Sequence, residues 1–199
     1  SDQAELFVLY GRRRVGKTEL LHAFCADKPH IFFIATLSSD SEQLATFSQQ
    51  VYGFIHSDVP AGFTFPSWEA ALRALSEFPT QPKPIIVLDE FTYLISGNKA
   101  IPSILQKVWD ETLKNIPIMM VLCGSYIGMM EKEVLGYQAP LYGRRTASFL
   151  LQPMDLPSSA LFFPGYSAEE KFITWAVVGG MPFYLRTFRD KRDIFSNIR

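Results

Sequence analysis

The strongest constraint on the fold is an eight-residue segment that matches the phosphate-loop template G-x-x-x-x-G-K-[ST] at every fixed position. It occupies residues 11–18. Its glycines allow the backbone to curl until several N–H groups point at phosphate oxygens, and Gly16 allows a close approach. In such a loop Lys17 reaches the β- and γ-phosphates, and the hydroxyl of Thr18 binds Mg²⁺.

The flanking residues have the pattern that this template requires. Residues 6–10 form a continuous apolar run, which is typical of a buried parallel strand. Residues 18–24 predict a helix with Leu20, Leu21 and Phe24 on one face, and its positive dipole end would face bound phosphates. We therefore assign nucleotide contacts to a set of loop residues: Gly11, Arg14, Val15, Gly16, Lys17, Thr18 and Glu19.

Composition limits the size of the core, the partners and the compartment. A chain of 199 residues can bury one sizeable core and a small second lobe, and its net charge of −1 provides no global basic field for nucleic acid or anionic lipid. No run approaches the ~20 apolar residues of a membrane span, and no signal peptide is visible. Cys25 and Cys123 are isolated and lack metal-ligand spacing, so we expect a cytoplasmic protein.

Short apolar runs alternate with amphipathic stretches, as in a parallel sheet that helices cover on both faces. Four further strands are predicted, at residues 30–35, 85–88, 117–123 and 146–151. Helices are predicted at 41–55, from an N-cap at Ser67 to about Phe78, at 101–114, at 167–177 and at 182–189, with a proline-bounded link at 153–157. We expect a three-layer α/β/α domain over residues 1–156, with a five-stranded, mainly parallel sheet, and the start of a small helical lobe over residues 157–199.

Two acidic residues follow the predicted strand at 85–88. Asp89 projects from the carboxyl end of that strand, where ligands of open α/β sheets bind, so we expect it to hold Mg²⁺ together with Thr18. Glu90 would orient and deprotonate the attacking water. An acidic turn after a buried strand is the alternative, and the complete phosphate loop favours the functional interpretation. The pair favours hydrolysis over phosphoryl transfer to a metabolite.

Three further residues are candidates for contacts with the γ-phosphate. Ser125 can hydrogen-bond the γ-phosphate or the attacking water, or it can cap the following helix, and the sequence favours neither. Arg144 and Arg145 are the best candidates for an arginine that stabilises transition-state charge, although isolated arginines are commonly solvated. The arginines at positions 12–14 could face solvent, a nucleotide base or a partner.

Together these segments resemble the prokaryotic P-loop ATPases of the archaeal ATPase and STAND type. The resemblance covers nearly the whole chain and rests on five segments: 9–18, 88–94, 123–125, 140–146 and 178–185. It implies the sheet order of the ASCE class, with the fourth strand between the phosphate-loop strand and the Asp89 strand. That order would put Ser125 beside the γ-phosphate as a sensor. The resemblance also implies adenine nucleotides and an ATP-driven switch.

Members of that family usually begin with a segment resembling F-x-G-R-E-x-E-L, which helps to hold the adenine, and usually continue into a winged-helix region. This chain begins at Ser1, downstream of the first segment, and ends at Arg199 inside a predicted helical region. We therefore expect a core ATPase fragment with a truncated lobe.

We predict Mg²⁺-dependent ATP hydrolysis that drives a conformational switch, with catalytic roles for Lys17, Glu90, Ser125, Arg144 and Arg145. The alternative is a nucleotide-gated adaptor for nucleic acid or a protein partner, with little intrinsic hydrolysis. Its basis is the arginine clusters and the aromatic-rich residues 183–188, although packing of those aromatics on the core is the favoured explanation. We expect no membrane contact. A homo-oligomer, and partners bound through regions absent from this chain, stay open.

Overall fold

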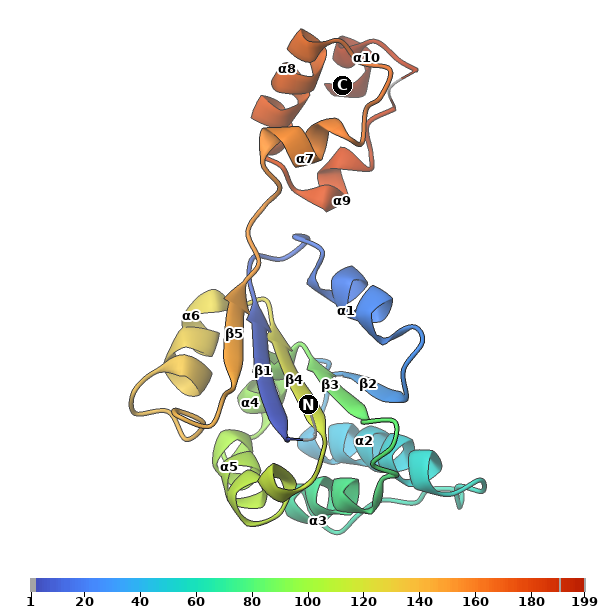
Figure 1. Ribbon diagram of the computed structural model, residues 1–199, viewed down its shortest axis with the longest axis vertical. Coiled ribbons are helices and arrows are strands. Elements are labelled where there is room, and N and C mark those ends of the chain that lie inside the picture. The colour runs from blue at the N-terminus through green and yellow to red at the C-terminus, as the bar shows by residue number, and fades with distance from the viewer. Residues whose placement is uncertain (1–2, 190, 199) are drawn as a thin grey trace.

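In the residues that the computed structural model describes, 3–189 and 191–198, five parallel strands form one sheet. They are β1 (Glu5–Tyr10), β2 (His30–Ile34), β3 (Ile85–Asp89), β4 (Met119–Gly124) and β5 (Ala147–Leu150). The strand order is β2-β3-β4-β1-β5, and every neighbouring pair is parallel (Figure 1). The predicted α/β fold class is confirmed, and β4 lies between β1 and β3 as the family resemblance implied.

Ten helices and three short turns of helix surround or follow this sheet in the described residues. Those of the α/β domain are α1 (Lys17–Cys25), α2 (Asp40–Ile55), α3 (Trp68–Ala74), η1 (Leu75–Glu77), α4 (Phe91–Gly97), α5 (Ile101–Glu111), η2 (Leu113–Asn115), α6 (Ile127–Met130) and η3 (Glu131–Leu135). Those of the helical lobe are α7 (Leu156–Ala160), α8 (Ala168–Val178), α9 (Pro182–Leu185) and α10 (Ile194–Ile198).

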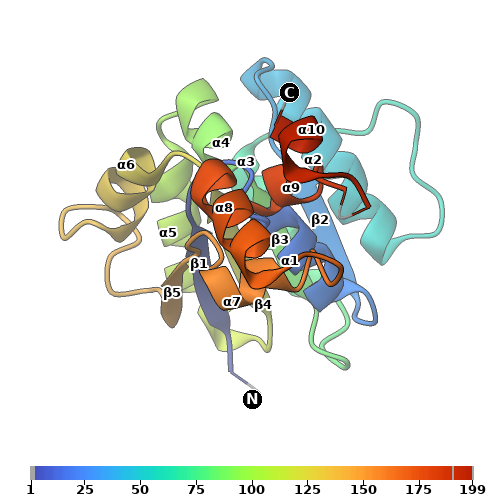
Figure 2. The same cartoon turned by 90° about the horizontal axis from the view of Figure 1, so that it is seen from above.

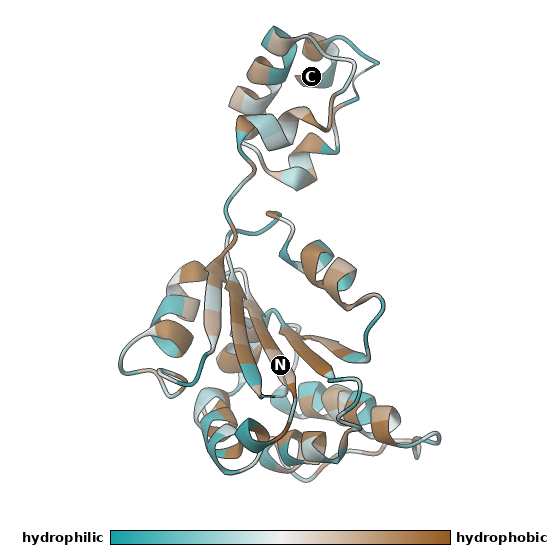
Figure 3. Ribbon diagram, viewed as in Figure 1, coloured by the Kyte–Doolittle hydropathy of each residue, from teal (hydrophilic) through white to brown (hydrophobic). Residues whose placement is uncertain are grey.

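Alternation of side chains along the strands builds a core on each face of the sheet. Side chains such as Val8, Leu88 and Leu122 point to one face and pack with the helices α2 to α5. Leu9 and Val87 point to the opposite face and pack with Leu21 and Cys25 of α1. Figure 2 shows α1 on one side of the sheet and α2 and α4 on the other, and Figure 3 shows that the strands are apolar along most of their length.

The predicted apolar face of α1 is only partly buried, so the prediction is wrong for two of its three residues. Leu21 is buried, whereas Leu20 and Phe24 are 48% and 40% exposed. The helix contacts the sheet through Leu21 and Cys25, which lie four residues apart and therefore share one side of the helix. Leu20 and Phe24 are displaced to the flank, where they line an apolar hollow together with the half-exposed Phe149.

Several predicted helix ends are wrong by three or four residues. The predicted helix at 101–114 stops at Glu111 and is followed by a 3-10 turn, and the one that begins at Ser67 changes to a 3-10 turn at Leu75. The helix predicted at 182–189 ends at Leu185. The short helices α4, α6, α7 and α10 were not predicted, because four to seven residues are too few to show a helical period.

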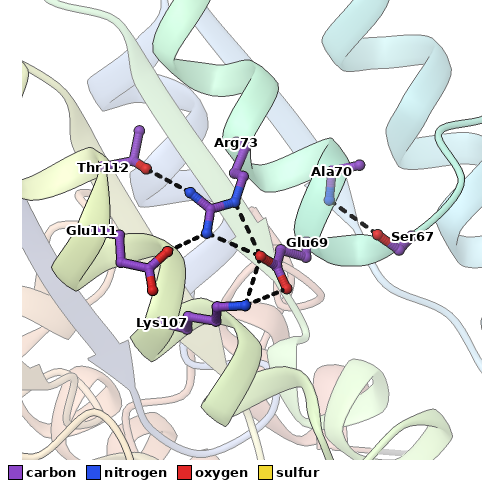
Figure 4. A network of polar contacts seen from close by, with 7 residues as sticks. All are labelled: Ser67, Glu69, Ala70, Arg73, Lys107, Glu111 and Thr112. Atoms are coloured by element: carbon purple, nitrogen blue, oxygen red, sulfur yellow. Dashed lines mark hydrogen bonds and ion pairs between the residues drawn. The ribbon is translucent and has the colours of Figure 1, made fainter.

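A charged network joins α3 to α5 (Figure 4), and these helices lie at the end of the molecule opposite the helical lobe in Figure 1. Arg73 donates hydrogen bonds to Glu69, Glu111 and Thr112, and Lys107 donates to Glu69. Hydrogen bonds from Lys107, and next from Arg73, lower the pKa of Glu69. The network therefore stabilises the fold at neutral pH, and that contribution is lost as the pH falls through the lowered pKa.

The helical lobe has a small core of its own, built from Phe163, Tyr166 and Leu185. It is joined to the sheet by residues 151–155, and α7 begins at Leu156, the last residue that sequence analysis gave to the first domain. The linker is fixed to the lobe at Met154, whose N–H donates to Gly180 O at 2.8 Å and whose carbonyl accepts from the Trp175 indole at 3.1 Å.

We expect Gly180→Ala to loosen the lobe. A methyl group at Gly180 would lie 2.0 Å from the carbonyl oxygen of Met154, and the backbone there has a φ of 68°. The strain and the clash should lower the free energy of unfolding by at least about 3 kcal/mol. Urea denaturation measures that loss, and faster amide hydrogen exchange in α8 locates it in the lobe.

Gly179→Ala is the matched control. Gly179 has a φ of 69°, but a methyl group there would meet nothing within 4 Å. Only the left-handed backbone penalises this variant, by about 1–2 kcal/mol. Equal losses in the two variants would contradict the role assigned to the Met154 contact.

Candidate nucleotide site

The phosphate loop connects the end of β1 at Tyr10 to the start of α1 at Lys17. Its backbone turns at Arg14 and Gly16, which have φ values of 68° and 100°. The buried ammonium of Lys17 donates to the carbonyl oxygens of Gly11 at 2.9 Å and Arg12 at 3.0 Å, so the lysine is held across the loop. A nine-residue helix beginning directly after this loop places its positive dipole end toward the loop.

The first residue of the loop lies against the segment that leads to the lobe. A methyl group at Gly11 would lie 2.4 Å from the carbonyl oxygen of Leu151, and the N–H of Leu151 donates to Tyr10 O at 2.7 Å. Only glycine allows the loop to begin at this point without displacing the end of β5.

Thr18 and Asp89 lie together although 71 residues separate them. The Thr18 hydroxyl donates to Asp89 Oδ2 at 2.7 Å, and the N–H of Glu90 donates to Asp89 Oδ1 at 2.9 Å. Asp89 is buried at the carboxyl end of β3. Both carboxylate oxygens of Asp89 are therefore positioned by hydrogen bonds at the mouth of the loop.

This pair provides hard oxygen donors of the kind that Mg²⁺ prefers. In the part of the chain that the structure describes, no group of three or more His, Cys, Asp or Glu side chains could hold a metal. Mg²⁺ is commonly held by one or two protein oxygens plus substrate phosphates and water, rather than by an all-protein cage. Thr18 and Asp89 therefore fit the ion that the sequence predicted.

Glu90 and Ser125 are joined by a hydrogen bond of 2.7 Å from the serine hydroxyl to Glu90 Oε2. Glu90 has a left-handed backbone, with a φ of 51°, where β3 turns into α4. The N-cap residue of α6 is Tyr126, not Ser125, so capping does not account for the serine side chain. The structure brings both predicted residues to the same edge of the sheet as Lys17.

Cys123 lies beside this cluster but is not a reactive group. Burial, and next the charge of Asp89, raise the pKa of the Cys123 thiol far above its usual range. The thiol stays protonated at neutral pH and serves as a small apolar residue of the core.

A groove of about 610 Å³ lies between the phosphate loop and the helical lobe. Its lining residues from the α/β domain are Arg13, Arg14, Gly16, Lys17, Thr18, Glu19 and Glu90, and those from the lobe are Pro182, Phe183, Tyr184 and Arg186. Of the predicted contact residues, Gly11 and Val15 do not line this groove, and Val15 is buried. The groove has the volume of a small-molecule site, about 300–1,000 Å³.

Two contacts connect the lobe to the phosphate loop across this groove. The Arg14 guanidinium lies 4.5 Å from the centre of the Phe183 ring and 5.4 Å from that of Tyr184, and it donates to Tyr184 Oη at 2.6 Å. Arg186 Nη1 lies 3.8 Å from Glu19 Oε1. The position of α9 is therefore tied to the conformation of the loop.

These lobe residues were not predicted as site residues. Packing of the aromatics at 183–188 on the core was the favoured prediction, and Phe188 does pack on the core of the lobe. Phe183 and Tyr184 are instead exposed and face Arg14. The signal for them in the sequence is the resemblance of residues 178–185 to a family motif.

Arg144 and Arg145 are not brought to the phosphate loop within this chain. They precede β5, whose pairing with β1 puts Ala147 beside Phe7 and Leu150 beside Tyr10. They therefore lie at the opposite end of the sheet, more than about 10 Å of strand away from the loop. Arg144 donates to both carboxylate oxygens of Asp110 at 2.7–3.0 Å, and Arg145 donates to Leu135 O at 2.9 Å.

We expect Arg144 to contribute to the stability of the fold through Asp110. Arg144→Gln removes a two-pronged ion pair that is only partly exposed, and should lower the free energy of unfolding by about 1 kcal/mol. A double-mutant cycle compares urea denaturation of the wild type, Arg144→Gln, Asp110→Asn and the double variant. Additive losses in the double variant would show that the two side chains do not stabilise the fold as a pair.

A family model described as an ATPase domain predominantly from Archaea matches residues 1–188. The uncharacterized protein MJECL04 of Methanocaldococcus jannaschii is 32% identical over 185 residues, which are 93% of this chain and 39% of that protein. MJ0424 of the same organism is 44% identical over 53 residues, which are 27% of this chain and 52% of that protein. This chain therefore spans about two fifths of the length of the first relative and matches half of the second.

Two solved structures have a similar fold. The Walker-type ATPase PABY2304 of Pyrococcus abyssi has a TM-score of 0.69 at 21% identity, covering 97% of this chain and 65% of that one. A chain of the Drosophila ORC bound to DNA has a TM-score of 0.58 at 13% identity, covering 100% of this chain and 49% of that one. At these identities the likeness shows the fold alone.

Proposed function

We propose that this chain, which belongs to the family of ATPase domains found predominantly in Archaea, binds ATP with Mg²⁺ and hydrolyses it to move its helical lobe. The observation that carries the proposal is the cluster at the end of β3. There the Thr18–Asp89 pair lies beside a glutamate that Ser125 holds in place. The cluster combines ligands for Mg²⁺ with a carboxylate that can accept a proton.

The groove between the loop and the lobe has residues suited to the phosphates and to the base of a nucleotide. The loop N–H groups and the Lys17 ammonium would bind the phosphates. Pro182 and Phe183 give the lobe side an apolar rim suited to a nucleobase. The preference for adenine rests on the family. Residues 98–101 begin like the N-K-x-D motif by which GTPases recognise guanine, but Ile101 stands where that motif requires an acid, so guanine has no support.

Thr18 and Asp89 would hold Mg²⁺, which when bound neutralises charge on the phosphates. Glu90 would take a proton from the water that attacks the γ-phosphorus, while ADP leaves. The hydrogen bond from Ser125 orients the Glu90 carboxylate, and the left-handed backbone at Glu90 fixes where that side chain starts. Ser125 is therefore a positioning residue in this proposal.

Arg186 is the arginine of the helical lobe that lines the groove, in addition to Arg13 and Arg14 of the loop. It lines the groove with Lys17 and Thr18, whereas Arg144 and Arg145 are held at the far end of the sheet. Its weak pairing with Glu19, at 3.8 Å and largely exposed, leaves it free to exchange partners. Binding of a γ-phosphate would draw Arg186 and α9 toward the loop. Action of Arg144 or Arg145 across an interface with a second copy stays a separate proposal.

Among residues 3–189 and 191–198, no helix combines the length and the apolar character that crossing a bilayer requires. The cytoplasmic location is a proposal that rests on the two free, buried cysteines, Cys25 and Cys123.

Glu90→Gln should lower ATP turnover by at least about a hundredfold, because the amide cannot accept the proton. Binding of a fluorescent ATP analogue should persist, since Lys17, Thr18 and Asp89 are unchanged. Phosphate release and analogue binding measure the two effects. Undiminished turnover in Glu90→Gln would remove the glutamate from the mechanism.

Ser125→Ala should lower turnover by roughly tenfold, and Ser125→Thr should restore most of it, because the hydroxyl returns.

Arg186→Gln should lower turnover by about tenfold or more, because a positive charge near the γ-phosphate is lost. Arg189→Gln is the control, since Arg189 is an exposed arginine of the same lobe that does not line the groove. Arg144→Gln is the competing variant. If folded Arg144→Gln protein lost turnover while Arg186→Gln stayed fully active, Arg144 and not Arg186 would be the arginine that stabilises charge on the γ-phosphate.

A further inference from the structure

We propose that a second groove, on the other flank of the phosphate loop, binds single-stranded nucleic acid. The groove has a volume of about 410 Å³ and lies where the loop meets α4 and the start of α6. Arg12, Arg13, Tyr93, Ser125 and Tyr126 are among its lining residues, so it adjoins the catalytic cluster at Ser125. Arg13 lines both grooves, whereas Arg12 and Tyr126 line only this one.

The groove carries two arginines that form no ion pair in the described residues, and the acid that the contacts place beside it is Glu90, which is hydrogen-bonded to the lining residue Ser125. None of its lining residues is acidic, and no carboxylate of residues 3–189 or 191–198 lies within 4.0 Å of the Arg12 or Arg13 guanidinium. Arg73 and Arg144, by contrast, are paired with carboxylates. An anionic ligand is the partner that two adjacent, uncompensated guanidinium groups would recognise.

The aromatic side chains identify which anion fits best. Tyr126 is 66% exposed at the rim of the groove, and Arg13 donates to Tyr93 Oη at 3.2 Å, which holds that ring beside the arginines. An exposed ring beside two arginines offers a stacking surface for a base and donors for the adjacent phosphate. An acidic peptide would pair with the arginines but would not need a stacking contact with Tyr126.

The geometry favours a single strand over a duplex. Bases in a duplex are stacked on one another, so their faces are not available to a tyrosine ring, whereas an unpaired strand presents them. The arginines can contact the backbone phosphates without reading bases. Binding should therefore tolerate any sequence and depend strongly on salt. The overall charge of −1 does not oppose this, because the field is local to the groove.

The test measures fluorescence anisotropy of a labelled oligothymidylate of about 20 nucleotides, at about 50 mM and about 200 mM salt. Wild-type protein should bind, with affinity falling steeply as salt rises. Arg12→Gln should weaken binding about tenfold and reduce the slope of log affinity against log salt by about 0.7, because one phosphate contact is lost. Tyr126→Ala should weaken binding about tenfold with the slope unchanged, because stacking is not ionic.

Two matched variants are controls. Arg192→Gln removes an exposed arginine of the lobe, and Tyr137→Ala removes a tyrosine that is 83% exposed elsewhere on the α/β domain. Both should bind the oligonucleotide like wild type. Thermal melting and binding of a fluorescent ATP analogue, followed in every variant, separate a local effect from misfolding and from failure of the nucleotide site.

Three outcomes would overturn the proposal. One is the absence of oligonucleotide binding at the lower salt concentration. Another is an equal loss of binding in the control variants, which would mean a diffuse charge effect. The third is tighter binding of poly-aspartate than of the oligonucleotide, lost in Arg12→Gln but kept in Tyr126→Ala, which would assign the groove to an acidic protein partner.

Discussion

The hydrogen bond between Thr18 and Asp89 depends on the whole arrangement of the sheet. The two residues belong to different strand–helix units, and β4 separates the strands that carry them. They meet because all five strands are parallel, so their carboxyl ends share one edge, and because the loop after β1 reaches across the end of β4. The same edge holds Glu90 and Ser125. Loss of the parallel register would disperse the site even if every side chain were present.

The parts of this site that could be predicted from the sequence are those fixed by local pattern. The phosphate loop and the acidic pair follow buried strands directly, so Lys17, Thr18, Asp89 and Glu90 were placed by position alone. Ser125 needed the strand order as well, which only the family resemblance supplied. The hydrogen bond between Ser125 and Glu90 could not be predicted, because a contact between the ends of neighbouring strands depends on side-chain rotamers.

Arg144 and Arg145 do not lie at the phosphate loop within this chain, and the reason is their position relative to β5. Arg144 and Arg145 have the right chemistry, but they lie before β5, and a residue before a parallel strand lies at the opposite edge from one after it. Arg186 lies on a separate lobe, and its distance from the loop depends on how that lobe docks. Similarly, the aromatic residues at 183–188 do not all have the same environment, since Phe188 packs in the core of the lobe and Phe183 contacts Arg14. A helical period that extends over only four residues, as in α9, is too short to reveal this.

The contact between Gly11 and Leu151 places the start of the linker to the lobe against the phosphate loop. The N–H of Leu151 donates to Tyr10 O at the end of β1, and the chain turns from there toward the lobe. In the proposed movement of the lobe, a rotation about this linker would therefore begin beside the loop, where Arg14 also contacts Tyr184 of the lobe. Such a rotation would displace α10, at the far end of the lobe in Figure 1, more than the residues near the linker. The close approach that Gly11 allows would couple the lobe to the loop without a path through the core.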